Sequence, residues 1–384
     1  MNTRALVQMA REALAAGQSC VLCTVVRLDG SGYGRPGARL LITESGQRTG
    51  YVSGGCLEKD LCQRVWAATQ SGPRLMAFDT RGNSVTPTPY NTGCEGVVYV
   101  LAQRISADAT LPIDVLDCVD SERQPARMLT IYRTCSDKYR VGDMLIEMAD
   151  QRFTSRDDLA IEESCERPWV TASRDSTLIF QDQEGCDVEA AIEVRMPPRE
   201  LVLFGAGDDA LPLVRSAAML GWNVTVIGKR PELASRERFH AQNANEHVEV
   251  RCGDPATVCK RIEFHSRTDV VVMTHDFEGD VRLLPHLLRS PCRYIGLLGP
   301  KRRLALLVGR LFQDGYPLGS NEIARVRSPI GLDIGAVSPE EIAISIVAEL
   351  IALERDREGG SLHLRQQPLH ETCAPLRMPQ PVLP

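Results

Sequence analysis

The stretch YVSGGCLEKDL, residues 51–61, places a cysteine between a glycine-rich turn and a segment with helical spacing. Gly54 and Gly55 end a strand-like run, Cys56 opens the helical segment and Glu58 follows two residues later. A thiol at a helix N-terminus is expected to have a lowered pKa, because the helix dipole favours the thiolate. Thiolates ligate soft metals such as molybdenum and accept or transfer sulfur. The alternative is a small buried hydrophobic residue in a tight turn, and the sequence leaves both open.

Two more glycine-rich segments in the first hundred residues carry chemically useful side chains. GSGYGRPGARLL, residues 30–41, is predicted to be a loop that contains Arg35 and Arg39. Guanidinium groups on a flexible backbone suit a phosphate or a pterin carbonyl, although a solvent-facing loop explains the composition equally well. NTGCEGV, residues 91–97, adds a second cysteine, Cys94, in a glycine-flanked turn.

The pair CVLC at residues 20–23 matches the C-x-x-C pattern, but it lies within a predicted strand. Residues three apart on a strand point to opposite faces of the sheet. We therefore expect neither a metal site nor a redox disulfide from Cys20 and Cys23.

The segment LVLFGAGDDALPLV, residues 201–214, has a strand, a glycine-rich turn and a helix in order. Gly205 and Gly207, with Ala210, form the G-x-G-x-x-A pattern of a dinucleotide-binding fold. The first glycine makes the tight turn, the second lets a phosphate approach the backbone, and the helix N-terminus attracts the anion. The pattern predicts phosphate or dinucleotide binding, with a purely structural turn as the alternative.

Charges near this turn modify the prediction. Asp208 and Asp209 put two negative charges where an anion would bind. The second strand ends in Gly228, where an NAD site would have an acidic residue about 20 residues after the turn. Lys229 and Arg230 follow it, so the sequence disfavours NAD and permits an extra phosphate.

THDFEGD, after the fourth predicted strand of this half, adds His275, Asp276 and Asp280 at the carboxyl end of a strand. Open α/β sheets bind ligands at that end. These side chains could be catalytic, could contact a ligand, or could cap the next helix.

The elements that would position these residues indicate two domains of an α/β protein. Residues 1–197 are predicted to form a mixed α+β domain, with a helix from Cys56 to about Thr69 and a strand over TGYVSGG. Its middle part, residues 104–197, contains two predicted hairpins. Beyond the linker MPPREL, short apolar strands alternate with helical patterns over residues 198–358, which predicts a Rossmann-like parallel sheet. Residues 359–384 are expected to form a loosely ordered tail.

Composition narrows the classes of protein. The net charge is −6 and the pI is about 5.8, which argues against a general nucleic-acid binder. Thirteen cysteines in 384 residues are too dilute for a disulfide scaffold and fit reduced thiols. The N-terminal segment lacks the apolar run of a signal peptide, and no segment approaches the ~20 apolar residues that span a membrane. We expect a cytoplasmic protein that binds neither nucleic acid nor membrane.

Taken together, these segments resemble the xanthine dehydrogenase accessory protein family, XdhC/CoxI. The resemblance covers about residues 1–100 and 199–356, through GYVSGGCLE, GCEGVVYVL, LVLFGAGDD, THDFEGD, YIGLLGPKRR and SPIGLDIGAV. It implies a protein that binds molybdenum cofactor, helps the cofactor acquire its terminal sulfido ligand and delivers it to molybdenum hydroxylases. Cys56 and Glu58 match the family's GGC-x-E motif, and Cys94 matches its GCGG-like turn.

The sequence departs from the family pattern at four places. Asp208 replaces a histidine, Gly228 replaces an aspartate, Glu95 interrupts the GCGG turn, and Pro300 replaces a serine. Three of these departures lie in the Rossmann-like half, so they affect nucleotide binding more than the cysteine site.

The leading hypothesis is a cofactor chaperone rather than an enzyme, which holds molybdopterin, with or without an added nucleotide, between its domains. The expected partners are a molybdenum hydroxylase client, a cysteine desulfurase and a second copy of the chain. Cys56 is the predicted metal ligand. The predicted cofactor-binding residues are Arg35, Gly54, Gly55, Cys56, Glu58, Cys94, Gly205, Gly207, Lys229, Arg230, His275 and Asp276. Two alternatives are an NADP-dependent oxidoreductase with His275 as acid/base, and a structural partner protein with a vestigial Rossmann site.

Overall fold

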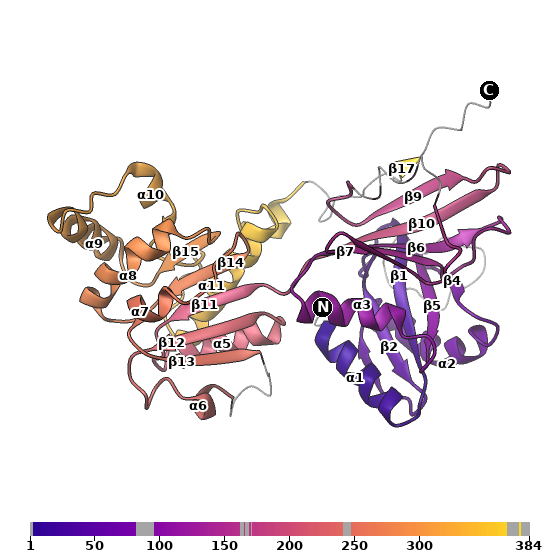
Figure 1. The fold of residues 1–384 in the computed structure, drawn as a ribbon, viewed down its shortest axis with the longest axis horizontal. Helices are drawn as coiled ribbons and strands as arrows, with labels where there is room; N and C mark the ends of the chain where they lie inside the picture. The colour runs from indigo at the N-terminus through magenta and orange to yellow at the C-terminus, as the bar shows by residue number, and fades with distance from the viewer. Residues whose placement is uncertain are drawn as a thin grey trace. The chain divides into compact units, whose positions relative to one another are not determined.

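The structure is a computed structural model that describes residues 3–81, 96–161, 165, 169, 171–240, 247–366 and 376–377. The chain divides into two compact units (Figure 1). Residues 1–197 and 370–384 form the first unit, and residues 198–369 form the second. Each unit has its own sheets and its own buried core.

The first unit begins with a five-stranded antiparallel sheet in the order β3-β2-β1-β5-β4. Helix α2 (Cys56–Ala68) packs on one face, and α1 (Thr3–Ala15) packs on the other. Cys23 belongs to the core on the α2 face and Cys20 to the core on the α1 face, which confirms that this pair points to opposite sides. The strands are β1 (Cys20–Gly30), β2 (Arg39–Thr43), β3 (Arg48–Gly50), β4 (Arg74–Asp79) and β5 (Gly96–Ile105).

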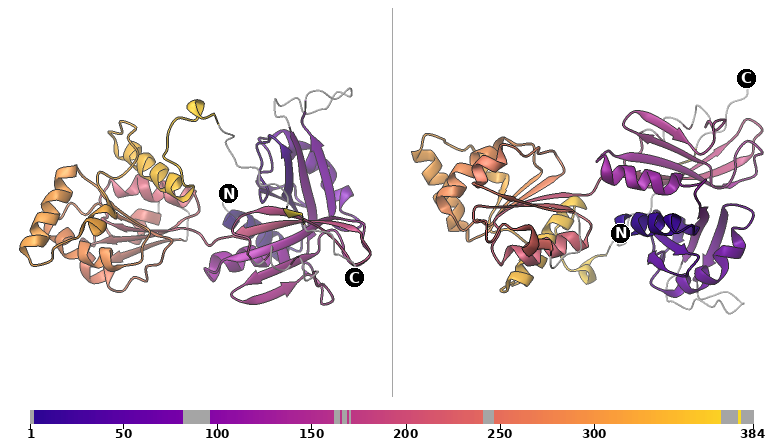
Figure 2. Two further views of the ribbon diagram at one scale, coloured as in Figure 1. Left: turned by 90° about the horizontal axis from the view of Figure 1, so that it is seen from above. Right: turned by 60° about the horizontal axis from the view of Figure 1, so that its bottom comes forward.

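The middle of the chain builds a second sheet in this unit, most of which is drawn in magenta in Figure 2. Its strand order is β17-β9-β10-β6-β7-β8. Both predicted hairpins are confirmed, because β6 pairs antiparallel with β7 and β9 with β10. Helix α3 (Leu111–Ser121) contributes Ile113 to the core of the first sheet and Val115 to the core of the second. The strands are β6 (Ala126–Thr134), β7 (Met144–Met148), β8 (Gln151–Thr154), β9 (Ser176–Gln181), β10 (Asp187–Arg195) and β17 (Leu376–Arg377).

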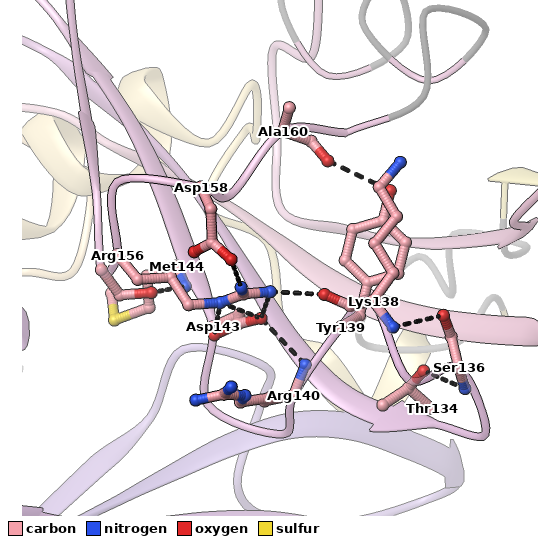
Figure 3. A network of polar contacts seen from close by, with 11 residues as sticks. Thr134, Ser136, Lys138, Tyr139, Arg140, Asp143, Met144, Arg156, Asp158 and Ala160 are labelled. Carbon is pink, nitrogen blue, oxygen red and sulfur yellow. Dashed lines mark hydrogen bonds and ion pairs between the residues drawn. The ribbon is translucent and has the colours of Figure 1, made fainter.

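A polar network stabilises the connection between β6 and β7 (Figure 3). The buried carboxylate of Asp143 accepts hydrogen bonds from the Arg140 backbone N–H at 2.8 Å and from the Arg156 side chain at 3.1–3.2 Å. Arg156 also pairs with Asp158 at 2.6 Å. Because Asp143 and Asp158 both pair with Arg156, we interpret this network as structural rather than catalytic.

The second unit has a six-stranded sheet in the order β13-β12-β11-β14-β15-β16, in which every neighbouring pair is parallel. This strand order is that of the dinucleotide-binding fold, so the predicted Rossmann-like architecture is confirmed. One face packs against α5 and α11, and the other against α8 and α9. The strands are β11 (Glu200–Phe204), β12 (Asn223–Gly228), β13 (Val248–Cys252), β14 (Thr268–Val272), β15 (Tyr294–Leu297) and β16 (Val326–Arg327).

Local sequence signals set the helix boundaries of this unit. Helix α11 begins with a capping box, in which the Ser338 hydroxyl accepts from the Glu341 N–H at 3.3 Å and the Glu341 carboxylate accepts from the Ser338 N–H at 3.0 Å. No helix in the described part of the chain is long and apolar enough to cross a membrane. The helices are α5 (Ala210–Met219), α6 (Arg236–His240), α7 (Pro255–Cys259), α8 (Phe277–Arg289), α9 (Lys301–Gln313), α10 (Ser320–Ala324), α11 (Pro339–Glu354) and the short η1 (Leu362–Leu364).

Candidate functional site

The predicted N-terminal site residues gather at one end of the five-stranded sheet. In the strand register, Thr24 lies opposite Arg39, Gly30 opposite Gly96, and Leu40 opposite Gly50. The loop after β1, the turn after β3 and the segment between β4 and β5 therefore all start at the same sheet end. This arrangement brings Arg35 to the same edge as Gly54, Gly55 and Cys56. Cys94 lies outside the described residues.

Residues 51–55 form the turn that leads into α2, which we call the Cys56 turn. The predicted strand over TGYVSGG is wrong beyond Gly50, because β3 ends there with a φ of 85° and the backbone then leaves the sheet. The N–H of Tyr51 still donates to the Arg39 carbonyl of β2 at 2.8 Å, but the two N–H groups after it bind one carboxylate instead of a strand. Glu58 Oε1 accepts from the N–H of Val52 at 3.0 Å and of Ser53 at 2.7 Å.

The second oxygen of Glu58 completes the network. Glu58 Oε2 accepts from the Gly55 N–H at 2.9 Å and from the Ser53 hydroxyl, whose oxygen accepts from the Leu57 N–H at 3.1 Å. Burial by itself would raise the pKa of Glu58, but the hydrogen bonds from Ser53 and from the backbone outweigh it, so the pKa is lowered. Glu58 is buried with both oxygens engaged by the turn, so its role in this geometry is to position the backbone ahead of Cys56.

Gly54 and Gly55 leave the front of this turn uncovered. Gly55 has a φ of 110°, which side-chain-bearing residues rarely adopt. A Cβ placed on Gly55 would meet nothing within 4 Å, and one placed on Gly54 would come no closer than 4.0 Å to Tyr33. Both glycines are exposed, so a ligand could approach the backbone next to the N-terminus of α2.

The loop at residues 31–38 packs directly against the Cys56 turn. A Cβ on Gly34 would lie 1.8 Å from the Val52 carbonyl oxygen, so only glycine permits this close approach. Gly37 donates its N–H to the Val25 carbonyl at 2.7 Å, which fixes the loop to β1. Arg35 is exposed on this loop, in keeping with a role in contacting a ligand.

Arg39 is a correction to the sequence-based prediction. It was expected to lie in the loop and to suit a phosphate, but it is buried in β2 and pairs with Glu193 of β10 at 2.8 Å. Arg195 pairs with the same carboxylate, and both arginines donate to the Gly37 carbonyl. The charge of Arg39 is paired inside the protein, so this side chain stabilises the base of the loop instead of binding a ligand.

The glycine-rich turn of the second unit, residues 205–209, has the expected backbone, but the side chain of Asp209 lies over one of its glycines. Gly205 has a φ of 131°, and a Cβ there would lie 2.3 Å from the Met273 carbonyl oxygen. The carboxylate of Asp209 folds back over Gly207, where Oδ1 lies 2.4 Å from the position a Cβ would take. Its Oδ2 is 2.8 Å from His275 Nε2. A side chain of the protein itself thus covers the glycine at which a phosphate would approach.

The end of β12 is closed as well. A Cβ on Gly228 would lie 2.6 Å from the Cβ of Ala206 and 2.9 Å from that of Ala234, so the backbone there has no room for a side chain. Lys229 is exposed with its Nζ 3.7 Å from Asp276, and Arg230 is exposed next to it. These two cations remain placed at the carboxyl edge of the sheet.

The other residues of this edge act mainly on each other. Asp276 caps α8, accepting from the Gly279 N–H at 3.0 Å. Asp280 is buried and bonded to Thr274 and to Arg303, the latter at 2.7 Å. Burial raises the pKa of Asp280, although the hydrogen bonds from Thr274 and Arg303 oppose the shift. The helix-capping interpretation of THDFEGD is therefore correct for Asp276, and His275 pairs with Asp209.

The chain is similar to known proteins in both of its units. Residues 5–79 match the XdhC and CoxI family, and residues 201–350 match the XdhC Rossmann domain. The chain belongs to the XdhC and CoxI family. It is 29% identical over 336 residues, 87% of this chain and 93% of the other, to a Bacillus subtilis protein named as a probable xanthine dehydrogenase subunit.

Two further relatives cover nearly the full length. The molybdenum cofactor insertion chaperone PaoD of Escherichia coli is 23% identical over 359 residues, which are 93% of this chain and 91% of PaoD. A crystal structure described as a xanthine dehydrogenase from Bacillus halodurans has a TM-score of 0.71 and 26% identity. It covers 94% of this chain, and 98% of its own chain is matched.

Sequence reasoning did not find the residues that organise the site from a distance. Glu193 is 154 positions from Arg39, and no local pattern connects them. Asp209 was noted only as an unfavourable charge, whereas its contact with His275, 66 positions away, shows where that charge lies. Ser53 was missed although a serine shortly before a helix is a familiar capping signal.

Proposed function

We propose that this protein is a molybdenum cofactor chaperone that stabilises the cofactor, supports its sulfuration and delivers it to a xanthine dehydrogenase-type molybdenum hydroxylase. The observation that carries the proposal is the Cys56 turn. Glu58 holds its backbone from behind, while Gly54 and Gly55 leave its front open at the N-terminus of a 13-residue helix. The membership of the XdhC and CoxI family and the likeness to PaoD support the same assignment.

The residues at this sheet end fit the chemical groups of a molybdenum cofactor. Cys56 would supply the soft thiolate ligand that molybdenum prefers, and the cofactor, when bound, would supply the metal that carries the sulfido ligand. The guanidinium of Arg35 suits the phosphate of the pterin side chain. Glu58 would act indirectly, because a fixed backbone keeps Cys56 in one position with little entropy left to lose on binding.

The proposal extends to partners and location. A chaperone must release its cargo, so we propose a transient complex with the client, whose own pocket binds the cofactor more tightly. A cysteine desulfurase as sulfur donor, a homodimer, and a cytoplasmic location belong to the same proposal. The NADP-dependent oxidoreductase has less support, because the carboxylate of Asp209 lies over Gly207, the glycine at which the pattern would let a phosphate approach.

A deletion strain tests the proposed function. Without this protein, the client hydroxylase should be expressed and assembled, but it should lack active, sulfurated cofactor. The measurements are client activity and sulfido-molybdenum content, with the wild-type chain restored as the control. Full activity with a normal sulfur content in the deletion strain would defeat the chaperone proposal and favour the oxidoreductase.

A further inference from the structure

Two tyrosines stand exposed beside the Cys56 turn. Tyr33 lies in the loop after β1 and Tyr51 is the first residue after β3. Their ring centroids are 6.0 Å apart, and the rings meet edge to face at 64°. Tyr33 is 68% exposed and Tyr51 is 43% exposed, so their mutual contact leaves much of both rings uncovered. Large exposed aromatic rings that share one patch are typical of binding surfaces.

The backbone that carries these rings is fixed on both sides. Tyr51 donates its N–H to the Arg39 carbonyl at 2.8 Å, which ties it to β2. Tyr33 is followed by Gly34, whose backbone approaches the Val52 carbonyl too closely to admit any side chain. Rings on anchored loops lose little conformational freedom when a ligand binds, which makes them effective binding groups.

The same rings border the glycines that precede Cys56. A Cβ built on Gly54 would lie 4.0 Å from Cγ of Tyr33, which is van der Waals contact. Gly54 is two positions before Cys56, so the aromatic rings and the start of α2 belong to one continuous surface. A ligand bound at this turn would therefore have Tyr33 as a neighbour, and Tyr51 lies against Tyr33.

We propose that Tyr33 and Tyr51 bind the planar pterin ring system of the cofactor. This inference rests on the proposed function, since it takes the pterin from that proposal. A pterin is a flat, polar heteroaromatic ring, and such rings stack on tyrosine in a way that tolerates detailed differences in hydrogen bonding. Because the two rings are inclined at 64°, a flat pterin would stack on one ring and meet the other edge-on, which would orient the cofactor while Cys56 contacts the metal.

Titration with a metal-free pterin, pterin-6-carboxylate, tests the rings without involving molybdenum. Its intrinsic fluorescence reports binding to the full-length protein. Tyr33→Ala and Tyr51→Ala should each weaken binding by about tenfold, within the range measured for losing one aromatic stacking partner. Tyr33→Phe and Tyr51→Phe keep the ring and should bind like the wild type. Phe153→Ala, which removes a 40% exposed aromatic ring from β8, is the matched control and should change nothing.

Several results would overturn the inference. Wild-type protein that does not bind the pterin more tightly than about 1 mM, or alanine variants that bind like the wild type, would exclude the tyrosines as a pterin site. Parallel titrations with CMP and GMP address the other aromatic part of a nucleotide-modified cofactor. If the alanine variants lose affinity for a nucleotide but keep their affinity for the pterin, the rings bind the base and the inference is wrong.

The same experiments separate this inference from the proposed function. If the deletion strain shows normal client activity while the tyrosine variants lose pterin affinity, the proposed function fails and the aromatic site stands. If the deletion strain behaves as expected but the tyrosine variants bind normally, only the aromatic site fails. Thermal unfolding of each variant shows whether the loops remain folded.

Discussion

Two turns of this molecule, one in each unit, share a plan and differ in where the carboxylate lies. Each turn joins a strand to a helix, contains two glycines, and has an acidic residue close behind them. In the Cys56 turn, Glu58 reaches back from inside α2 and binds the N–H groups of Val52, Ser53 and Gly55 from behind. In the Gly205 turn, defined as residues 205–209, Asp209 folds across the front of Gly207 and pairs with His275.

The difference teaches that a glycine-rich turn before a helix is not in itself an anion site. The helix N-terminus offers partial positive charge in both cases. What decides its availability is whether a carboxylate of the protein already lies in the space that a ligand needs. Both turns have a fixed backbone. The space in front of the glycines is uncovered in the Cys56 turn, whereas the Asp209 carboxylate fills it in the Gly205 turn.

Loss of the thiol should have the largest effect on this comparison. Cys56→Ala should lower the molybdenum content per chain by more than about tenfold, because losing a ligand should cost at least as much as losing an outer partner of a ligand. The control is Cys62→Ala, since Cys62 lies on the same helix and packs against the core. Metal analysis of purified protein provides the measurement. Equal molybdenum content in Cys56→Ala and the wild type would show that the open turn is not the metal site.

Removing the carboxylate behind the turn should act on stability. Glu58→Ala leaves the N–H groups of Val52, Ser53 and Gly55 without their acceptor, and hydrogen bonds to a charged group contribute about 1.5–3 kcal/mol. That range applies to one bond and three are lost, so denaturant unfolding should show a loss of at least that size. Glu341→Ala is the control, because Glu341 makes a similar cap on α11 but is exposed, so its loss should cost less. Equal losses in the two variants would mean that burial of Glu58 adds nothing to the turn.

Opening the filled turn should create affinity where there was little. Asp209→Ser removes the carboxylate that covers Gly207 and should strengthen NADP binding by about tenfold, or 1.4 kcal/mol. NADP should bind better than NAD because Lys229 and Arg230 follow a β12 that has no acidic residue at its end. Isothermal titration of the wild type and the variant provides the measurement. Low-micromolar NAD binding by the wild type would show that Asp209 does not block the site.

The smallest expected effect is the pH dependence of the Cys56 turn. The pKa of Glu58 is lowered in the folded protein from an ordinary value of 4.5. Its contribution is therefore complete above that value and is lost as the pH falls through the lower, folded-state pKa. The stability difference between the wild type and Glu58→Gln should be constant near neutral pH and shrink in acid. A difference that grows as the pH falls would contradict the lowered pKa.

The sequence predicted much of the fold because its signals are local. The alternating strands, the two hairpins of the middle segment and the helix starting at Cys56 each depend on neighbours a few positions away. The strand predicted over TGYVSGG ends at Gly50, because contacts that the local pattern does not show replace the strand pairing. Val52 and Ser53 fit a strand pattern, but their N–H groups donate to the Glu58 carboxylate instead of to a neighbouring strand. The hydrophobic pattern alone does not show that a side chain competes for these N–H groups.

The sequence by itself determined that a cysteine begins a helix directly after two glycines. It also determined that the second half of the chain is a parallel sheet with a glycine-rich turn. Only the tertiary structure decided which groups are available. From the sequence, Arg39 is available to a phosphate, but in the structure it pairs with Glu193 of β10. The glycine pattern likewise leaves Gly207 uncovered, but in the structure Asp209, paired with His275, lies over it. Charged side chains pair with groups that are close in space but can be far apart in the sequence. Partners 66 or 154 positions away do not affect local spacing or periodicity, so the sequence pattern cannot show them.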